Sequence, residues 1–317
     1  MTRRCTHENC FPDTTCALGH IDRANCEYWK EQDIAKEGEV KQPETPTNDL
    51  PWNGYALGTS DISVLGGRGQ PRVIGLIGPS NSGKTSLLAY IYMWLIKHGK
   101  IGDWRFAGSW TLGGWESIVQ YGRWIGEPPP SFPPHTTSAG RHPGVLHIAL
   151  RHSVSGNLRD VMFTDAPGEW FTQWARVPGD PNAVGARWVV NNSDVLLLLI
   201  DSKALATPEE LPQTRRATRD LIERVGAENT HQRVTIVWTK DDIDVPDTTR
   251  NALERACSEF LPRADKRRTT VNMPGTIEQC FADAINAAEN RTRLVEAIET
   301  RQSNDPFLAF RGIHVSA

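Results

Sequence analysis

One stretch of eight residues restricts the fold of this chain more than any other. It is GPSNSGKT, from Gly78 to Thr85, and it matches the pattern G-x-x-x-x-G-K-[S/T] in full. An apolar run, RVIGLI, precedes it, and a segment with the apolar spacing of a helix follows it. Glycines let the backbone amides of such a loop turn towards an anion, and the helix start adds further free amides. The sequence therefore predicts a phosphate-binding loop between a strand and a helix.

The residues of this loop have separate expected roles. The Lys84 ammonium is expected to reach the outer phosphates of a nucleotide and to supply charge for catalysis, and the Thr85 hydroxyl to coordinate Mg²⁺. The predicted phosphate-binding set is Gly78, Pro79, Ser80, Asn81, Ser82, Gly83, Lys84, Thr85 and Ser86.

Short apolar runs alternate with helical periodicity from about residue 71 onwards. Strands are predicted at Arg72–Ile77, Gly144–His152, Arg159–Thr164, Val195–Asp201, Val234–Trp238 and Thr276–Ala282. Helices are predicted at Gly83–Lys97, Pro181–Asn191, Pro208–Val225, Thr248–Leu261 and Arg291–Gln302. The turn signal SVSGN between the second and third strands indicates one antiparallel hairpin. The expected fold class is α/β, with a doubly wound, mostly parallel sheet covered by helices on both faces.

The chain divides into four zones of different composition. Residues 1–30 form a Cys/His-rich head, 31–70 a polar linker, 71–302 the nucleotide-binding domain and 303–317 a tail. Within the domain, residues 98–143 form a tryptophan-rich insertion, in which WTLGGWESIVQYGRWIG has spacing compatible with a short helix. Its tryptophans have two interpretations, which are buried packing and a surface that depends on a partner or on the nucleotide.

A second motif, DAPG, directly follows the predicted strand Arg159–Thr164. An acidic group at a strand end beside a phosphate loop can hold Mg²⁺, and this is the role expected of Asp165. The amide of Gly168 can contact a γ-phosphate. The segment after it would then be held only while that phosphate is present.

A third motif, TKDD, follows the predicted strand Val234–Trp238. The Asp242 carboxylate can accept hydrogen bonds from both N1–H and the 2-amino group of guanine. Adenine has no such pair of donors, so ATP would leave a buried Asp242 unpaired. Thr239, Lys240 and Asp242 are therefore predicted to select GTP over ATP, with the Lys240 stem lying over the base.

Together the three motifs resemble those of the translation-factor-like and Ras-like (TRAFAC) class of P-loop GTPases, over roughly residues 71–302, with Thr239 where Asn is commoner. The insertion, DAPGE and the Cys/His head also resemble the bacterial double-GTPase family of conflict systems. This resemblance implies GTP or GDP with Mg²⁺, a molecular switch with a protein effector or regulator, and a setting in antiviral defence. Because the sequence has one phosphate loop, it also implies pairing with a second copy or a sister protein.

The resemblance also assigns roles that the motifs alone do not give. A switch threonine that meets Mg²⁺ and the γ-phosphate corresponds to Thr136 or Thr137, with Thr137 taken as the catalytic and metal-binding candidate; an ordinary turn is the alternative. A last guanine contact corresponds to Asp283–Ala284.

Glu169 stands where this class usually orients the attacking water, often with glutamine. An ionised carboxylate accepts but cannot donate a hydrogen bond, and the phosphates repel it. Glu169 therefore either positions water or turns outward to a partner. No arginine finger is identifiable in the chain, so slow, partner-activated hydrolysis is expected, and a scaffold without hydrolysis and an ATP-dependent enzyme are the alternatives.

Four of the six cysteines lie in the first 26 residues. In a cytosolic-looking chain such density favours a metal over disulfides. Four of Cys5, Cys10, Cys16, His20 and Cys26 would complete a tetrahedral, structural Zn²⁺ site. Redox-active thiols and disulfides are the alternatives, and Cys257 and Cys280 are expected to be buried apolar residues.

Charge and hydropathy exclude some classes of protein. The net charge is −3 without a long basic run, which argues against nucleic acid as a partner, and RADKRR is expected to be a solvated helix end. The longest aliphatic run, VLLLLI, is too short to cross a bilayer, and the N-terminal residues lack the apolar core of a signal peptide. We therefore expect a cytoplasmic protein.

Overall fold

The computed structural model describes residues 2–5, 26–32, 56–58, 69–122, 144–228 and 233–290 of the 317-residue chain. The chain divides into two compact units, Met1–Pro51 and Trp52–Ala317.

The first unit contains an antiparallel pair of short strands. These are β1 (Thr2–Cys5) and β2 (Trp29–Gln32), and Cys5 lies opposite Trp29. Cys26, which is buried, lies three residues before β2. The pair thus joins the two ends of the cysteine-rich segment, while Cys10, Cys16 and His20 lie outside the described residues.

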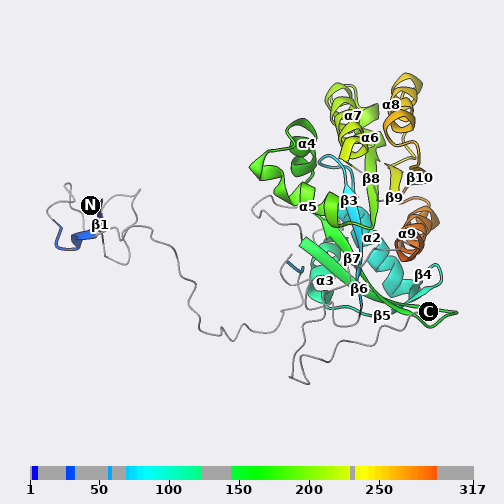
Figure 1. Ribbon diagram of the computed structural model, residues 1–317, viewed down its shortest axis with the longest axis horizontal. Helices are drawn as coiled ribbons and strands as arrows, with labels where there is room; N and C mark the ends of the chain where they lie inside the picture. Colours follow the sequence, from blue (N-terminus) through cyan, green and yellow to red (C-terminus); the bar gives the residue numbers. More distant parts are fainter. Residues whose placement is uncertain are drawn as a thin grey trace, which may run out of the picture. The chain divides into compact units, whose positions relative to one another are not determined.

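The second unit is built on a sheet of eight strands (Figure 1). They are β3 (Arg72–Ile77), β4 (Lys100–Ile101), β5 (Trp104–Gly108), β6 (Gly144–His152), β7 (Leu158–Asp165), β8 (Val195–Asp201), β9 (Arg233–Thr239) and β10 (Asp265–Thr269). Their order is β10-β9-β8-β3-β7-β6-β5-β4; neighbours from β10 to β7 are parallel, and those from β7 to β4 are antiparallel. The expected hairpin is confirmed as the β6–β7 pair.

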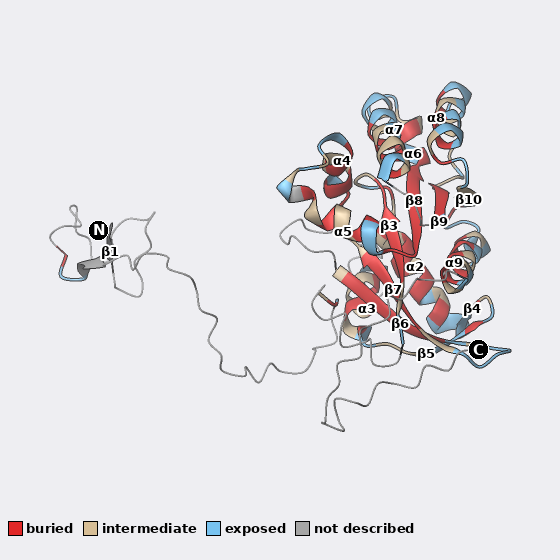
Figure 2. Cartoon of the chain, viewed as in Figure 1, coloured by how far each residue is buried: buried red, intermediate tan, exposed pale blue. Residues whose placement is uncertain are grey.

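Helices cover both faces of this sheet. They are α2 (Lys84–His98), α3 (Leu112–Val119), α4 (Gly168–Arg176), α5 (Val184–Asn192), α6 (Ser202–Ala206), α7 (Leu211–Glu228), α8 (Asp247–Phe260) and α9 (Pro274–Glu289). One apolar cluster joins the sheet to α2, α3 and α9, and a second joins it to α4, α5, α7 and α8. Figure 2 shows the buried strands between helices whose outer faces are exposed. The predicted doubly wound α/β fold is confirmed.

Two sequence predictions near the C-terminal end of the domain were wrong. Thr276–Ala282, predicted as a strand, lies within α9, because Ile277, Phe281 and Ile285 recur at helical spacing and Pro274 occupies a first-turn position. The fifth strand of the parallel part of the sheet is instead β10, in the RADKRR segment that was expected to end a helix. It lies at the sheet edge, where a strand can carry charged side chains on its exposed positions. The predicted helix Arg291–Gln302 and the tail lie outside the described residues.

The tryptophan-rich insertion extends the sheet and adds a helix. Its strands β4 and β5 continue the sheet beyond β6, and the short helix expected in this segment is present as α3. Trp115 of α3 is fully buried, stacks on Tyr92 at 5.2 Å between ring centroids and meets Phe163 edge-on at 5.9 Å. Trp104 is also buried, whereas Trp110 is 45% exposed. Two of these three tryptophans are therefore packed in the core, and one is at the surface. Residues 123–143 of the insertion lie outside the described residues.

A buried histidine on β6 anchors the insertion. The Trp110 backbone amide donates to His147 Nδ1 at 3.0 Å, so the proton of the neutral ring lies on Nε2, 2.8 Å from Asp160 Oδ1. The His147 backbone amide donates to Thr111 Oγ1 at 2.8 Å, and its carbonyl accepts from Trp115 Nε1 at 2.9 Å. These bonds pair the backbone amide and carbonyl of His147, on the side of β6 where β5 no longer runs beside it.

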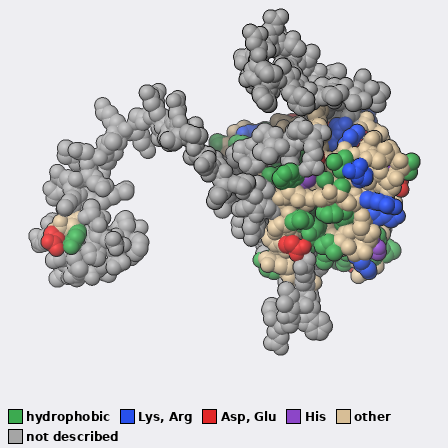
Figure 3. Space-filling view, turned by 90° about the horizontal axis from the view of Figure 1, so that it is seen from below, with side chains coloured by type: hydrophobic (Ala, Val, Ile, Leu, Met, Phe, Trp, Pro, Cys, Tyr) green, Lys and Arg blue, Asp and Glu red, His purple; other side chains and the backbone are tan. Residues whose placement is uncertain are grey.

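Three positively charged side chains occupy neighbouring positions on β4, β5 and β6 and form a row across these strands. Lys100 of β4 is opposite Arg105 of β5, and Arg105 is opposite Arg151 of β6, all three exposed. Lys and Arg side chains also gather at one side of the face shown in Figure 3, beside a group of hydrophobic side chains.

Candidate functional site

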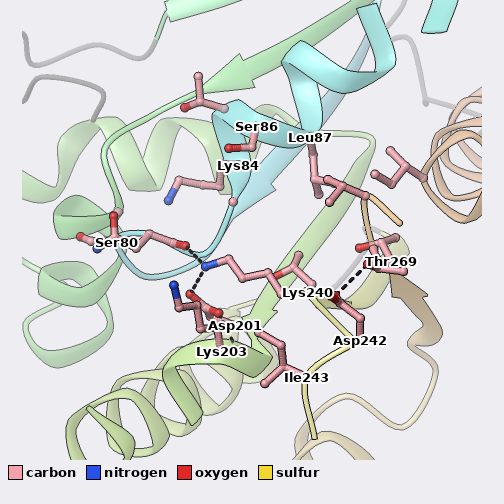
Figure 4. Close-up of a pocket in the computed structure, with 18 of the residues that line it drawn as sticks. Ser80, Lys84, Ser86, Leu87, Asp201, Lys203, Lys240, Asp242, Ile243 and Thr269 are labelled. Carbon is pink, nitrogen blue, oxygen red and sulfur yellow. Dashed lines mark hydrogen bonds and ion pairs between the residues drawn. The ribbon is translucent and has the colours of Figure 1, made fainter. Parts of the chain in front are cut away.

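A cavity of about 510 Å³ lies at the carboxyl ends of the parallel strands. Its lining comes from the loop after β3, the DAPG segment after β7, Asp201 at the end of β8, the TKDD segment at the end of β9 and the residues after β10. Ligands of open α/β sheets bind at this end of the strands. Figure 4 shows side chains from these separate segments converging on the cavity.

The loop from Gly78 to Thr85 has the geometry of an anion cradle. Asn81 and Gly83 have left-handed backbones, with φ of 63° and 94°, and α2 begins at the next residue, Lys84. Such turns direct successive amides to one side, towards the cavity at the helix start. The predicted strand–loop–helix arrangement is confirmed.

Lys84 is buried at the centre of this cradle. Its Nζ donates to the carbonyls of Gly78 and Pro79, each at 3.0 Å. Burial lowers the pKa of Lys84 to about 8, against the nearby charges of Asp165 and Glu169, which raise it. A bound anion would favour the charged form, so the site is suited to phosphate.

Thr85 and Asp165 form a magnesium-compatible pair. Thr85 Oγ1 lies 3.0 Å from Asp165 Oδ1 and 3.2 Å from Oδ2. Hydroxyl and carboxylate oxygens are ligands that Mg²⁺ accepts, and the ion usually keeps several waters and adds phosphate oxygens. These residues therefore fit the ion. Thr136 and Thr137, the switch candidates, lie outside the described residues.

The first turn of α4 packs directly on the phosphate loop. A Cβ atom on Gly168 would lie 2.2 Å from the Ser80 backbone nitrogen, so the close approach requires glycine. The next residue, Glu169, is exposed and accepts a hydrogen bond from Ser80 Oγ at 2.7 Å. The structure thus places both predicted residues against the loop.

Two residues of TKDD connect the loop to β8 and β9. Thr239 Oγ1 donates to the Ser82 carbonyl at 2.9 Å. Lys240, with a left-handed φ of 54°, donates from Nζ to the Asn81 carbonyl at 2.9 Å and to Asp201 Oδ2 at 2.7 Å. Sequence reasoning missed Asp201, which is buried at the end of β8 and also caps α6; an acidic residue ending an aliphatic strand was the available signal.

The other predicted base contact, Asp242, is held from the loop after β10. Its Oδ1 accepts from Thr270 Oγ1 at 2.7 Å and its Oδ2 from Asn272 Nδ2 at 2.9 Å, and the side chain is exposed. Thr269, Thr270 and Val271 line the cavity. Sequence reasoning missed them because it did not recognise β10 as the strand that delivers them.

The last guanine contact, predicted at Asp283–Ala284, was wrong. Both residues lie inside α9, where Ala284 is buried and Asp283 forms an ion pair with Arg267 at 2.7 Å. Neither lines the cavity, because the loop that reaches it precedes α9.

The described residues contain no group of three or more His, Cys, Asp or Glu side chains able to hold a metal. Of the zinc candidates, only Cys26 has a described side chain, and it is a buried free thiol. Across the same described segments, no helix is both long and apolar enough to cross a membrane.

Fold and cavity together define a P-loop nucleotide-binding protein: a doubly wound sheet with a lysine-bearing phosphate cradle, a Thr–Asp pair and the Asp242 carboxylate in the cavity lining. The model of the family described as Double-GTPase 2 matches residues 72–290, and the chain belongs to this family. It is therefore a GTP-binding protein with GTPase activity.

Two solved structures show distant similarity. A nucleolar GTP-binding protein 1 from Plasmodium falciparum is 12% identical, with a TM-score of 0.42, and the match covers 70% of this chain and 88% of that one. Era, solved in complex with MgGDPNP and nucleotides 1506–1542 of 16S ribosomal RNA, is 15% identical, with a TM-score of 0.37. That match covers 72% of this chain and 60% of Era. No curated protein matches the chain.

Proposed function

We propose that this chain is a GTP-dependent molecular switch with slow intrinsic hydrolysis that acts through protein partners. The observation that carries the proposal is the packing of the first turn of α4 on the phosphate loop, through Gly168 and Glu169. A γ-phosphate bound beside this turn would add contacts to the first residues of α4, and these contacts would be lost on hydrolysis, as in other nucleotide switches. The nucleotide state would thereby be transmitted to α4.

Two parts of the machinery for hydrolysis have clear candidates. Lys84 supplies a buried positive charge, and Thr85 with Asp165 would hold Mg²⁺. When bound, Mg²⁺ neutralises charge on the phosphate oxygens. Lys84 and the loop amides bind and orient the phosphates, so placement and charge are provided by this chain.

Orientation of the attacking water is the weaker part. Glu169 can accept a proton from water, but when ionised it cannot donate to the transferred group, and the phosphates repel its charge. In the structure its carboxylate bonds to the loop instead. These features support slow hydrolysis, and they also support a second candidate function, a nucleotide-binding scaffold without significant hydrolysis.

The partner is proposed from the family and the sequence. The family is described as a double GTPase, whereas this sequence has one phosphate loop, so a second copy or a sister GTPase is the proposed regulator. A bacterial defence system is the proposed setting. We also propose a cytoplasmic location, supported by the free thiols of Cys26, Cys257 and Cys280.

The head is proposed to bind structural zinc through four of Cys5, Cys10, Cys16, His20 and Cys26. Pairing of β1 with β2 supports this, because it joins the ends of the segment that contains the other candidate ligands. A closed zinc shell would stabilise a segment too short to bury its own core.

The test is single-turnover hydrolysis of GTP by the full chain across a range of protein concentrations. We expect a rate on the order of 10⁻⁴ to 10⁻² per second at low concentration, as for GTPases without a trans-acting partner. The rate should rise with concentration if copies activate each other. Fast hydrolysis by the isolated monomer would contradict the proposal, and none at any concentration, even with the sister GTPase, would favour the scaffold.

A further inference from the structure

Ser80 and Glu169 occupy a shared position between two cavities. Both line the nucleotide cavity, and both line a neighbouring groove of about 440 Å³. The groove is lined further by α4, through Thr172, Gln173 and Arg176, and by Gln213 of α7. The Ser80–Glu169 contact therefore lies at the boundary between the nucleotide cavity and the groove beside α4.

The direction of this hydrogen bond is fixed by its chemistry. An ionised carboxylate only accepts, so the Ser80 hydroxyl donates to Glu169 Oε1, across 2.7 Å. A bond to a charged acceptor is stronger than one between neutral groups. Ser80 belongs to a loop fixed between β3 and α2, whereas Glu169 lies in the first turn of a helix that begins at Gly168. The bond thus joins the first turn of α4 to the phosphate loop.

The packing beneath the bond leaves little freedom to α4. Gly168 is so close to the backbone of Pro79 and Ser80 that even one added carbon would overlap it. With this backbone contact below and the side-chain bond above, Glu169 is held over the phosphate loop. While Oε1 of Glu169 accepts the Ser80 proton, one of its lone pairs is occupied, and the carboxylate is less available to accept a proton from water.

We propose that Ser80 is a positioning residue that restrains hydrolysis: its hydroxyl latches Glu169 onto the phosphate loop, and release of Glu169 is required for it to act on water. This inference rests on the proposed slow GTPase and assigns its slowness to a specific contact. Under this proposal, Glu169 positions water when it is released from Ser80. When it is bound to Ser80, it links the phosphate loop to α4.

The first measurement does not depend on catalysis. In the nucleotide-free full chain, Ser80→Ala should increase amide hydrogen exchange in the first turn of α4 by about threefold to tenfold, because a bond holding that turn is lost. Ser80→Thr keeps a hydroxyl and should stay closer to the parent chain than to Ser80→Ala. Ser258→Ala is the matched control, since its hydroxyl donates to Glu254 O on the exposed face of α8, and its exchange in α4 should equal the parent's.

The second measurement is single-turnover GTP hydrolysis by the same variants. Ser80→Ala should hydrolyse GTP about threefold to tenfold faster than the parent, and this gain should vanish when Glu169→Ala is added. An unchanged or lower rate in Ser80→Ala overturns the proposal. A gain that persists without Glu169 overturns it too, because the latch would then not act through that residue.

The two measurements separate this proposal from the proposed function. If the parent chain shows no hydrolysis while Ser80→Ala loosens α4 and hydrolyses GTP, the latch stands and the proposed intrinsic hydrolysis of the parent fails. If hydrolysis is slow and α4 exchange is unaffected by Ser80→Ala, the GTPase stands and the latch fails.

Discussion

At the scale of single residues, the proposed contact to the base is one carboxylate that two side chains hold. Asp242 receives hydrogen bonds from Thr270 and Asn272, both in the loop after β10, and its side chain remains exposed towards the cavity. Each carboxylate oxygen has a further lone pair, so both can still accept from a guanine edge.

Replacement of this carboxylate by an amide should change the preferred base. In Asp242→Asn, one acceptor becomes a donor, which opposes guanine N1–H and 2-amino groups and suits the 2-oxo group of xanthine. We expect GTP affinity to fall by about 100-fold or more and XTP affinity to exceed it, measured with fluorescent nucleotides. Asp241→Asn is the matched control: Asp241 pairs with Arg250 and Arg268 instead, so its base preference should not change.

Lys84 should make nucleotide binding consume protons. Its pKa of about 8 in the nucleotide-free chain reflects burial, and bound phosphates favour the charged form, so binding raises the pKa. At pH 8.5, Lys84 is then mostly neutral before binding and charged afterwards, with an uptake of roughly 0.7 proton; at pH 6.5 it is charged in both states. Calorimetry of Mg·GDP binding in two buffers of different ionisation enthalpy measures this uptake, and equal enthalpies at pH 8.5 would count against it.

At the scale of elements, α4 depends on a glycine at its first position. Gly168→Ala would place a carbon 2.2 Å from the Ser80 nitrogen, which is backbone and cannot rotate away, so α4 must shift. We expect a loss of about 1–3 kcal/mol in the free energy of unfolding and a GTP hydrolysis rate at least about tenfold lower. Gly179→Ala is the control, because nothing lies within 4 Å of its added carbon, and it should match the parent in chemical denaturation and hydrolysis.

The elements that the sequence predicted well are those with strong apolar patterns. β8 is seven buried residues, VLLLLID, and a central parallel strand needs such a run. β10 has the sequence DKRRT and, among the described strands, pairs with β9 alone. Its charged residues hide the apolar pattern by which a strand is recognised. The loop after β10 was therefore missed as well.

Contacts between distant segments account for most of what remained hidden. The anchoring of the insertion joins His147 to residues 36 and 37 positions earlier, and no local pattern marks such a pair. Three of the expected functional clusters, by contrast, are local motifs at the carboxyl ends of strands. A parallel sheet brings these ends together at one edge. Residues of the phosphate loop, of Ala166–Gly168 and of Thr239–Asp242 therefore line one cavity.

At the scale of the whole molecule, the chain combines a GTPase domain with a separate cysteine-rich unit. Elemental analysis of the full chain should find about one zinc per molecule, because four thiolate or imidazole ligands complete a structural site. Cys10→Ser with Cys16→Ser leaves three of the five candidates and should abolish the zinc.

Cysteines of the GTPase domain provide the control for this measurement. Burial raises the pKa of Cys257 to about 11 and that of Cys280 to about 12, so neither supplies a thiolate near neutral pH. Cys257→Ala should retain the full zinc content. A parent chain without zinc, purified under reducing conditions, would rule out the metal and favour free thiols.

The row formed by Lys100, Arg105 and Arg151 has a consequence for how copies of this chain can meet. Among the described residues, β4 is the last strand of the sheet, and its outer edge is one to which a strand of another copy could add. A second copy aligned edge to edge in this register would bring its own Lys100 opposite this one, and directly opposed like charges destabilise a strand pair. At low salt, this repulsion opposes the joining of two copies through their β4 edges. We therefore expect two GTPase domains to pair through other surfaces.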